Sequence, residues 1–264
     1  MPELLLLGVG QVAAAARSRL RGVRARGTSR RAPDARFADV EHVAADDDLA
    51  IAQAARGADV VVSFPPDGTA DARLAPLVAE ARSIVYVSST SVYPEGAREV
   101  DLATAVDPRP SGAAARRLDA EAAWLAVGAS IVRLPAYYGP NAGLHVRLRA
   151  SSFVMPGDGA TFVSRVHVDD AAAFVVAGLG APPRSILLAG DDEPAPVRDV
   201  VAFVADLFGL PLPPRGDRAA AHATLRGDRR VDSRATRERF GVRLAYPTYR
   251  DGYRAIHARL AAGA

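Results

Sequence analysis

Short apolar runs alternate with helical patterns through the first half of the chain. Four leucines at residues 4–7 end at Gly8, and small apolar residues then recur at helical spacing. Such runs are typical of buried parallel strands, and the helices between them are typical of βαβ crossovers. The pattern predicts strands at 4–7, 22–26, 36–40, 59–63, 83–88 and 130–134. It predicts helices at 12–20, 48–55, 70–81 and 113–126, the second of them started by the aspartates at 46–48.

The second half of the chain has a different pattern. Residues 197–208 place valine, leucine and phenylalanine on one helical face and end at Gly209. Further predicted elements are strands at 164–168 and 185–188, a helix at 170–179 capped by Asp169, an exposed loop with some helix at 215–235 and a terminal helix at 250–262. We therefore expect an α/β fold with a Rossmann-like doubly wound parallel sheet. The expected division is a dinucleotide-binding domain at 1–180, with a substrate-side loop at about 139–164, and a smaller C-terminal substrate lobe at 181–264.

Composition restricts the chemistry. The chain has 264 residues, 49% of them hydrophobic, so it can bury a sizeable core. Cysteine is absent, which excludes disulfides, thiolate nucleophiles and cysteine metal sites. The five histidines show no ligand spacing, so no metal is expected. No apolar run approaches the roughly 20 residues of a membrane span, and we expect a cytoplasmic protein without a membrane partner.

The junction between the first strand and helix has the spacing of a dinucleotide-binding loop. Gly8 permits a tight turn, Gly10 lets a pyrophosphate approach the backbone, and Ala13 lets the helix pack close to the strand. The helix N-terminus, with Gln11 and Val12, offers free N–H groups to phosphates. The alternative is an ordinary strand-to-helix turn, but the flanking strand and helix favour the cofactor loop.

The segment behind this loop favours NADP over NAD. No acidic residue lies between Gln11 and Pro33, where NAD-binding proteins carry the carboxylate that holds the ribose. Hydroxyl and guanidinium groups suited to a 2′-phosphate are present instead, at Thr28, Ser29, Arg30 and Arg31. An arginine-rich surface is the alternative. Nucleic-acid binding is disfavoured, because the net charge is only +3 and no aromatic platform accompanies the arginines.

A proline turn follows the predicted strand at 59–63. Its residues Ser63, Phe64 and Pro65 stand at the carboxyl end of a parallel strand, where such sheets bind ligands. We expect them to cover the adenosine and pyrophosphate of the cofactor, although the turn also has a purely structural interpretation.

Five later segments carry a family resemblance. They read VYVSSTSVYP at 85–94, IVRLPAYYGP at 131–140, RVHVDDA at 165–171, LAGDDEPAPV at 188–197 and FGVRLAYPT at 240–248. In this order they resemble extended short-chain dehydrogenase/reductases of the NAD(P)-dependent epimerase/dehydratase group. The resemblance implies a Rossmann fold, a nicotinamide cofactor, a small-molecule substrate and a homodimer.

The resemblance also assigns roles to individual residues. It implies that Ser89 hydrogen-bonds the reacting oxygen and that Thr90 lies beside the substrate. It places Ser88 and Pro135 at the cofactor. Arg117 stands where the family has a lysine that holds the nicotinamide ribose and lowers the pKa of a catalytic tyrosine.

That catalytic tyrosine is missing. In the helix register set by Glu121, Ala113 occupies its position, and no tyrosine lies between Tyr93 and Tyr137. The chain therefore resembles atypical members of the family. Tyr93, Tyr137 or Tyr138 could place a phenol in the crevice, each with packing as the alternative; Tyr138 is our candidate catalytic residue.

The substrate is expected between the main sheet and the C-terminal lobe. Its predicted walls are Tyr138, Asn141, His145, Phe153 and Arg165. His167, in a matched segment, is expected to bond the backbone beside Asp169 or Asp170 rather than to act in catalysis.

Two functions remain open from the sequence. The first is an NADP-binding oxidoreductase or epimerase-like enzyme acting on a small hydroxyl, carbonyl or sugar-derived compound. The second is a non-catalytic NADP-binding sensor or regulatory protein, which would explain Ala113 directly. An RNA- or protein-binding scaffold is the least favoured alternative.

Overall fold

A seven-stranded parallel sheet forms the centre of the protein. The computed structural model describes residues 3–29, 37–221 and 223–263. The strands of the sheet are β1 (Glu3–Leu7), β2 (Arg24–Thr28), β3 (Glu41–Val43), β4 (Asp59–Val62), β5 (Ser83–Ser89), β7 (Ser130–Leu134) and β12 (Ile186–Leu188). They lie in the order β12-β7-β5-β4-β1-β2-β3, and every neighbouring pair is parallel. The order reverses between β1 and β4, and ligands bind outside the carboxyl ends of strands at such a point.

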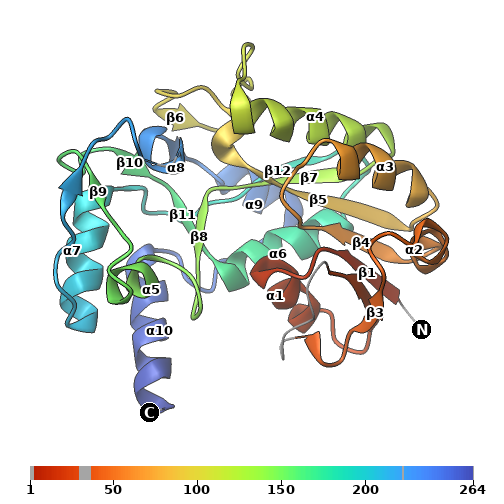
Figure 1. The fold of residues 1–264 in the computed structure, drawn as a ribbon, viewed down its shortest axis with the longest axis horizontal. Helices are drawn as coiled ribbons and strands as arrows, with labels where there is room; N and C mark the ends of the chain where they lie inside the picture. Colours follow the sequence, from red (N-terminus) through yellow and green to blue (C-terminus); the bar gives the residue numbers. More distant parts are fainter. Residues whose placement is uncertain (1–2, 30–36, 222, 264) are drawn as a thin grey trace.

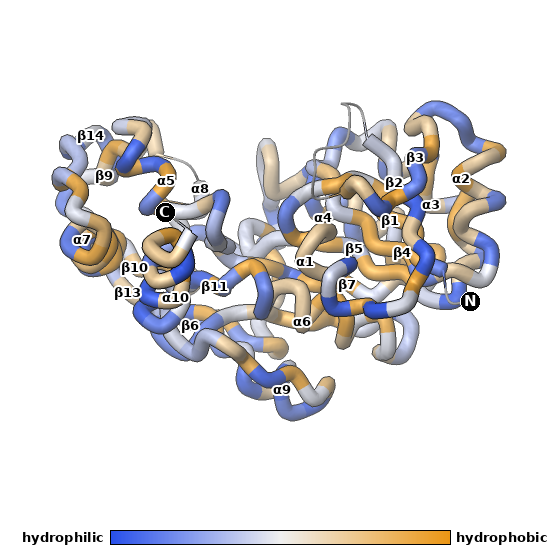
Figure 2. The backbone as a smooth tube through the Cα atoms, turned by 90° about the horizontal axis from the view of Figure 1, so that it is seen from below, coloured by the Kyte–Doolittle hydropathy of each residue, from blue (hydrophilic) through white to orange (hydrophobic). Residues whose placement is uncertain are grey.

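Helices cover both faces of this sheet (Figure 1). They are α1 (Gln11–Arg19), α2 (Asp48–Ala55), α3 (Thr69–Leu77), α4 (Gly112–Ala126) and α6 (Val168–Leu179). Successive strand residues point to opposite faces, so Leu4 and Leu6 pack with α1 and α6, whereas Leu5 and Leu7 pack with α2, α3 and α4. Figure 2 shows the hydrophobic residues concentrated in the sheet and the hydrophilic ones toward the outer turns. The predicted doubly wound Rossmann-like fold is confirmed.

A second lobe lies beside the sheet and has its own core. Its main helices are α5 (Leu144–Arg149), α7 (Val197–Phe208) and α10 (Tyr249–Ala262), which lie together on one side of the sheet in Figure 1. The smaller elements are η2 (Thr90–Val92), β6 (Glu99–Val100), β8 (Ala136–Tyr138), β9 (Met155–Pro156), β10 (Phe162–Val163), β11 (Arg165–His167), β13 (Ala195–Pro196), β14 (Arg215–Gly216), α8 (Ala223–Arg226), β15 (Arg230–Val231) and α9 (Arg234–Phe240). The buried valines of α7 pack against Tyr249, Tyr253 and Ile256 of α10, which confirms the predicted apolar face of α7.

The chain crosses between the sheet and the second lobe more than once. β12 belongs to the main sheet, although it lies beyond residue 180. Residues from Tyr138 to Met155 contribute instead to the core that contains α7 and α10. A single boundary at residue 180 therefore does not separate the two cores.

Three local predictions differ from the structure. The strand predicted at 36–40 is wrong over its described part: residues 37–40 form a turn closed by a hydrogen bond from Val40 N to Phe37 O, and β3 follows it. Arg36 lies outside the described residues. The apolar character of this turn reflects burial of the Phe37 ring in the core.

The cap of α6 is His167 rather than Asp169, because the helix starts two residues earlier than predicted. The predicted loop at 215–235 contains β14, α8 and β15, and Val231 within it is buried.

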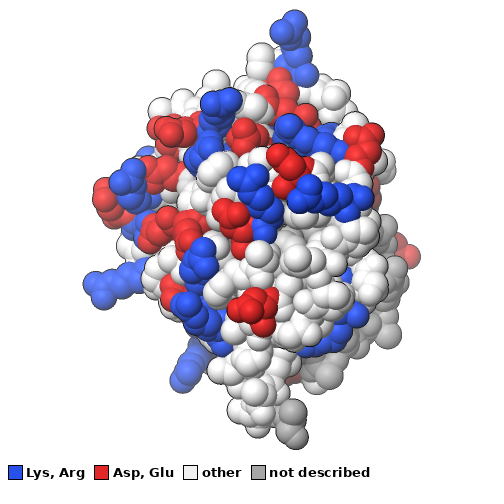
Figure 3. Space-filling model, turned by 90° about the vertical axis from the view of Figure 1, so that its left-hand side faces the viewer, with Lys and Arg blue, Asp and Glu red and all other residues white. Residues whose placement is uncertain are grey.

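The outer surface of the second lobe carries charges of both signs. Figure 3 shows basic and acidic side chains interspersed over this face, without a broad patch of one sign. Within the described residues, no helix is long and apolar enough to cross a bilayer, and no three histidine, aspartate or glutamate side chains are grouped as metal ligands.

Candidate active site

The glycine loop at the end of β1 is locked to its two neighbouring strands. Gly8 has φ +90°, and a Cβ there would lie 2.9 Å from the backbone nitrogen of Phe64. Its N–H donates to Thr28 Oγ1 at 3.2 Å, and its carbonyl accepts from Ser63 Oγ at 2.8 Å. Gly10, at the N-cap of α1, would place a Cβ with no atom within 4 Å. The loop is therefore tightly packed at Gly8 and open at Gly10, the geometry that a bound pyrophosphate requires.

Two cavities meet at this loop. One, of about 1140 Å³, lies over the ends of β1, β2 and β4, and the other, of about 430 Å³, extends toward β5 and β7. Both are lined by Gly10, Ser63, Phe64 and Pro65. The two cavities therefore lie next to each other at the switch point of the sheet.

The larger cavity contains the described part of the predicted 2′-phosphate site. Thr28 and Ser29 line it, and the Thr28 hydroxyl accepts a hydrogen bond from Gly8. Arg30 and Arg31 lie outside the described residues. His42, Asp46 and Arg73 also line this cavity and were not predicted there. Asp46 and Arg73 belong to segments whose pattern indicates only a helix start and a helix, and His42 lies outside every predicted element.

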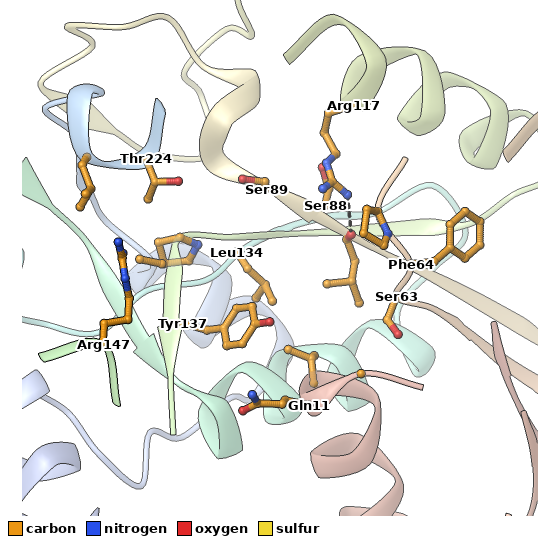
Figure 4. A pocket seen from close by; sticks show the side chains of 17 residues that line it. Gln11, Ser63, Phe64, Ser88, Ser89, Arg117, Leu134, Tyr137, Arg147 and Thr224 are labelled. Carbon is orange, nitrogen blue, oxygen red and sulfur yellow. Dashed lines mark hydrogen bonds between the residues drawn. The ribbon is translucent and has the colours of Figure 1, made fainter. Parts of the chain in front are cut away.

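The smaller cavity brings together most of the residues predicted at the reacting end of the cofactor (Figure 4). Gln11, Val12, Ser88, Ser89, Arg117 and Pro135 all line it. Ser89 Oγ accepts a hydrogen bond from Ser91 N at 3.1 Å, which leaves its hydroxyl hydrogen available. The hydroxyl of Ser88 instead donates to the buried carboxylate of Glu121.

Arg117 projects from α4 against the end of β5. Its Nη1 donates to Tyr86 Oη at 3.0 Å and to Val87 O at 3.2 Å. Burial raises the pKa of the Tyr86 phenol, although the nearby Arg117 opposes the shift. Tyr86 therefore stays protonated and serves as a fixed hydrogen-bond partner.

Tyr138 does not reach the cavity, contrary to prediction. Its side chain is 1% exposed, its hydroxyl donates to Thr248 O at 3.4 Å, and its ring stacks on Tyr253 with centroids 4.5 Å apart. Burial, with Asp191 adding to it, raises the pKa of this phenol far above its usual range. The neighbouring Tyr137 lines the cavity and is 43% exposed, because adjacent strand residues point to opposite sides.

Several predicted substrate walls also lie elsewhere. His145 and Arg165 are buried in the second lobe, where His145 Nε2 contacts Pro140 O at 3.2 Å and Arg165 Nη1 donates to Val163 O at 2.7 Å. Burial lowers the pKa of His145. The carbonyl of Asn141 accepts from the Gln11 side chain at 3.3 Å, but Asn141 does not line the cavity. Thr90 lines only a narrow neighbouring space of about 10 Å³.

The second lobe closes the far end of the smaller cavity with residues that the sequence analysis missed. They are Arg147 from α5 and Thr224 and Leu225 from α8. Phe153, a predicted wall, is buried beneath Arg147, whose guanidinium carbon lies 4.7 Å from the ring centroid. Arg147, Thr224 and Leu225 reach this cavity only through the packing of distant segments, so no local sequence motif predicts them.

Known proteins resemble this chain in sequence and in structure. The chain is 31% identical over 209 residues to a 3-diazoavenalumate denitrifying reductase from a Streptomyces species, and the match covers 70% of this chain and 68% of the relative. A functionally unknown conserved protein from Silicibacter pomeroyi is 30% identical, with a TM-score of 0.82 over 98% of this chain and 99% of that chain. The chain belongs to the extended short-chain dehydrogenase/reductase family. No protein-family model matches the chain.

A more distant structure of this family shares the fold. UDP-glucuronic acid 4-epimerase from Bacillus cereus, solved with UDP-glucuronic acid and NAD, has a TM-score of 0.79 at 14% identity, covering 99% of this chain and 100% of that chain. This match shows a shared fold. Ala113 lies at the exposed start of α4.

Proposed function

We propose that this protein is an NADP-dependent oxidoreductase that transfers hydride to or from a small molecule in the smaller cavity. The observation that carries the proposal is that the open glycine loop, Ser89 and Arg117 line one cavity at the switch point. A nicotinamide cofactor bound there would supply or accept the hydride. The substrate is a small hydroxyl, carbonyl or sugar-derived compound. A diazo compound is also included, because the Streptomyces relative is named for one.

The residues of the cleft fit a phosphorylated dinucleotide. The open backbone at Gly10 and the N-terminus of α1 would hold the pyrophosphate, since free N–H groups and the helix dipole favour anions. Thr28 and Ser29 offer hydroxyls at the end of β2, and no carboxylate follows them before Asp34. This composition supports a 2′-phosphate rather than the free ribose hydroxyl of NAD.

The cavity also offers groups that handle a substrate oxygen. Ser89 would donate its hydroxyl hydrogen to that oxygen, because its Oγ already accepts from Ser91 N. Arg117, fixed by Tyr86 and Val87, would orient the nicotinamide ribose. Tyr137 is the one tyrosine among the residues that line this cavity, so we assign to its hydroxyl the proton transfer that Ala113 cannot perform.

A cofactor titration tests the proposal. Calorimetry should show that NADPH binds more tightly than NADH. Arg30→Gln should lower the affinity for NADPH by about tenfold and leave the affinity for NADH unchanged, because a charged hydrogen bond to the 2′-phosphate is lost. Arg21→Gln, a change at an exposed arginine just before β2, is the matched control and should alter neither affinity. Tighter binding of NADH than of NADPH would contradict the assignment.

A non-catalytic sensor is the second candidate, and Ala113 favours it directly. A sensor would bind NADPH with unchanged affinity in Tyr137→Phe and would turn over none of a panel of carbonyl, hydroxyl and diazo compounds. Turnover that falls at least tenfold in both Ser89→Ala and Tyr137→Phe would support the enzyme and reject the sensor.

A further inference from the structure

The smaller cavity is positively charged. Two arginines, Arg117 and Arg147, are among its 17 lining residues, and no aspartate or glutamate is. The other lining residues are neutral, so charge within the cavity is not balanced by the groups that face it. A cleft of this kind attracts an anion.

The two arginines differ in what they already contact. Arg117 is held by hydrogen bonds to Tyr86 and Val87 on the sheet. Arg147 comes from α5 in the second lobe and forms no ion pair with a carboxylate in residues 3–29, 37–221 and 223–263. Arg117 likewise forms no ion pair among these residues, but its Nη1 is already bound to the sheet, whereas no hydrogen bond from the Arg147 guanidinium to them is present.

The Arg147 guanidinium lies over a buried aromatic ring. Its carbon lies 4.7 Å from the centroid of the Phe153 ring, and Phe153 is buried. A guanidinium held over an aromatic ring can still donate hydrogen bonds to a carboxylate. Exposed ion pairs usually contribute little, partly because long side chains lose freedom. Here the contact with Phe153 restricts the Arg147 side chain before a ligand binds, and a ligand filling the cavity would exclude water.

Arg147 lies at the end of the cavity away from the glycine loop. Figure 4 shows it with Thr224 on one side, opposite Ser63 and Phe64, with Ser89 and Tyr137 between them. The cavity lining also includes the apolar side chains of Leu134, Pro135, Ala136 and Leu225. An apolar body between a cationic end and a hydroxyl-bearing centre suits a molecule with a carboxylate at one end and its reacting atom near Ser89.

The size of the cavity limits that molecule. Ligand pockets typically range from about 300 to 1,000 Å³, and this cavity of about 430 Å³ would also receive the nicotinamide. The space that remains beside the nicotinamide suits a small acid better than a nucleotide sugar.

We propose that Arg147 binds the carboxylate of a small aromatic or unsaturated carboxylic acid and thereby defines the substrate class. The inference rests on the proposed function, since it places the reacting end of that acid beside Ser89 and the nicotinamide. Tyr137, 43% exposed at the cavity, would contact the planar body of the acid.

Binding of a matched pair of probes tests this subsite. Cinnamate and its uncharged amide, cinnamamide, are titrated by calorimetry into the full-length protein saturated with NADP⁺. Cinnamate should bind more tightly than the amide. Arg147→Gln should lower the affinity for cinnamate by about 10- to 100-fold and leave the affinity for cinnamamide unchanged, because only the charged hydrogen bonds are lost. Arg149→Gln is the control, since Arg149 is exposed on the same helix but does not line the cavity.

The outcomes separate this inference from the proposed function. Failure of the wild-type protein to bind NADPH overturns the proposed function, and the probes are then titrated into the cofactor-free protein. With or without cofactor, the carboxylate subsite is overturned if cinnamamide binds as well as cinnamate, or if Arg147→Gln and Arg149→Gln have equal effects. A preference for cinnamate that disappears only in Arg147→Gln supports it.

Discussion

Two glycines of the cofactor loop have separate physical roles. Gly8 combines a φ of +90° with contact to Phe64, so any side chain there meets both backbone strain and a clash. Gly10 has an ordinary φ of −98°, and its missing side chain leaves open space above α1. One glycine is needed for the loop to fold, whereas the other keeps the cleft empty.

Alanine substitutions should separate these roles. Gly8→Ala should lower the free energy of unfolding by more than about 2 kcal/mol, because the strain of a left-handed residue is added to the clash. Gly10→Ala should cost about 1 kcal/mol or less, as a poorer N-cap residue, and should weaken NADPH binding at least tenfold by filling the pyrophosphate approach. Urea denaturation and calorimetry measure the two quantities.

Gly57→Ala provides the control for backbone strain alone. Gly57 has φ +66°, yet a Cβ there would meet no atom within 4 Å. It should lose only the roughly 1–2 kcal/mol of the strained conformation and keep NADPH affinity. Equal losses of stability in Gly8→Ala and Gly57→Ala would show that the contact with Phe64 is unimportant.

The pair Tyr137 and Tyr138 shows where sequence reasoning fails at the scale of one residue. Both lie in β8, and from the sequence either could place its phenol in the crevice. The structure buries Tyr138 against Tyr253 and exposes Tyr137 at the cavity. Alternation along a strand decides between them, and the sequence does not show which face of so short a strand is turned inward.

At the scale of elements, a buried ion pair joins α4 to the sheet. Glu121 on α4 receives two hydrogen bonds from Arg133 on β7, at 3.0 and 2.7 Å, and a third from Ser88 on β5. The two side chains are only 3% and 11% exposed. This contact sets the position of α4, which carries Arg117, relative to β5, which carries Ser89.

Removal of one charge from this pair should be costly. Glu121→Gln leaves Arg133 charged and without its carboxylate in the interior, so the free energy of unfolding should fall by about 3–5 kcal/mol. Asp232→Asn breaks the exposed pair with Arg234, whose side chains are 41% and 73% exposed, and should cost less than about 1 kcal/mol. Urea unfolding measures the free energy of unfolding of both variants. Equal losses would mean that the buried pair stabilises the protein no more than the exposed pair does.

Other elements were predictable to different degrees. The six apolar positions predicted for one face of α7, and the continuous apolar runs of β1 and β7, fit only a buried helix face and buried strands. Their predicted ranges agree with the structure within a residue. The segment before β3 failed because a buried turn and a short strand both place apolar residues close together.

At the scale of the molecule, the order of segments and the family resemblance were sufficient to predict the sheet and the cleft. They could not predict which parts of the second lobe close that cleft. Arg147 and Leu225 are 78 positions apart in the sequence and meet at one cavity only through tertiary packing. Contacts of this kind leave no local periodicity from which to infer them.

The junction between sheet and second lobe contains a buried histidine that couples stability to pH. His167 lies between Tyr138 and Tyr246, with ring centroids 5.3 and 4.1 Å from its own, and its Nδ1 accepts from Asp169 N at 3.2 Å. Burial lowers the pKa of His167 from 6.5 to about 4, against the opposing charge of Asp169. Between these values the unfolded chain binds a proton that the folded protein does not. The stabilising contribution is therefore complete above pH 6.5 and is lost as the pH falls through 4.

Buried carboxyl groups act in the opposite direction. Burial raises the pKa values of Asp71, Asp170 and Asp191, so the folded protein holds their protons more tightly than the unfolded chain. Their contribution to stability is present at low pH and is lost as the pH rises through those raised values. The pH profile of the wild-type protein is the sum of both effects, and only a comparison with a histidine variant isolates His167.

We expect His167→Asn to remove the acid-side part of this profile. Asparagine can still cap α6 but does not titrate, so the stability advantage of the wild-type protein over the variant should shrink by about 2 kcal/mol between pH 7.5 and pH 4.5. Urea unfolding at the two pH values measures it. His257→Asn, at an exposed position of α10, should change the pH dependence by less than about 0.5 kcal/mol, as an ordinary surface substitution does. Parallel profiles for the wild-type protein and His167→Asn would mean that His167 titrates alike in the folded and unfolded chain, and the junction would then contribute nothing to acid sensitivity.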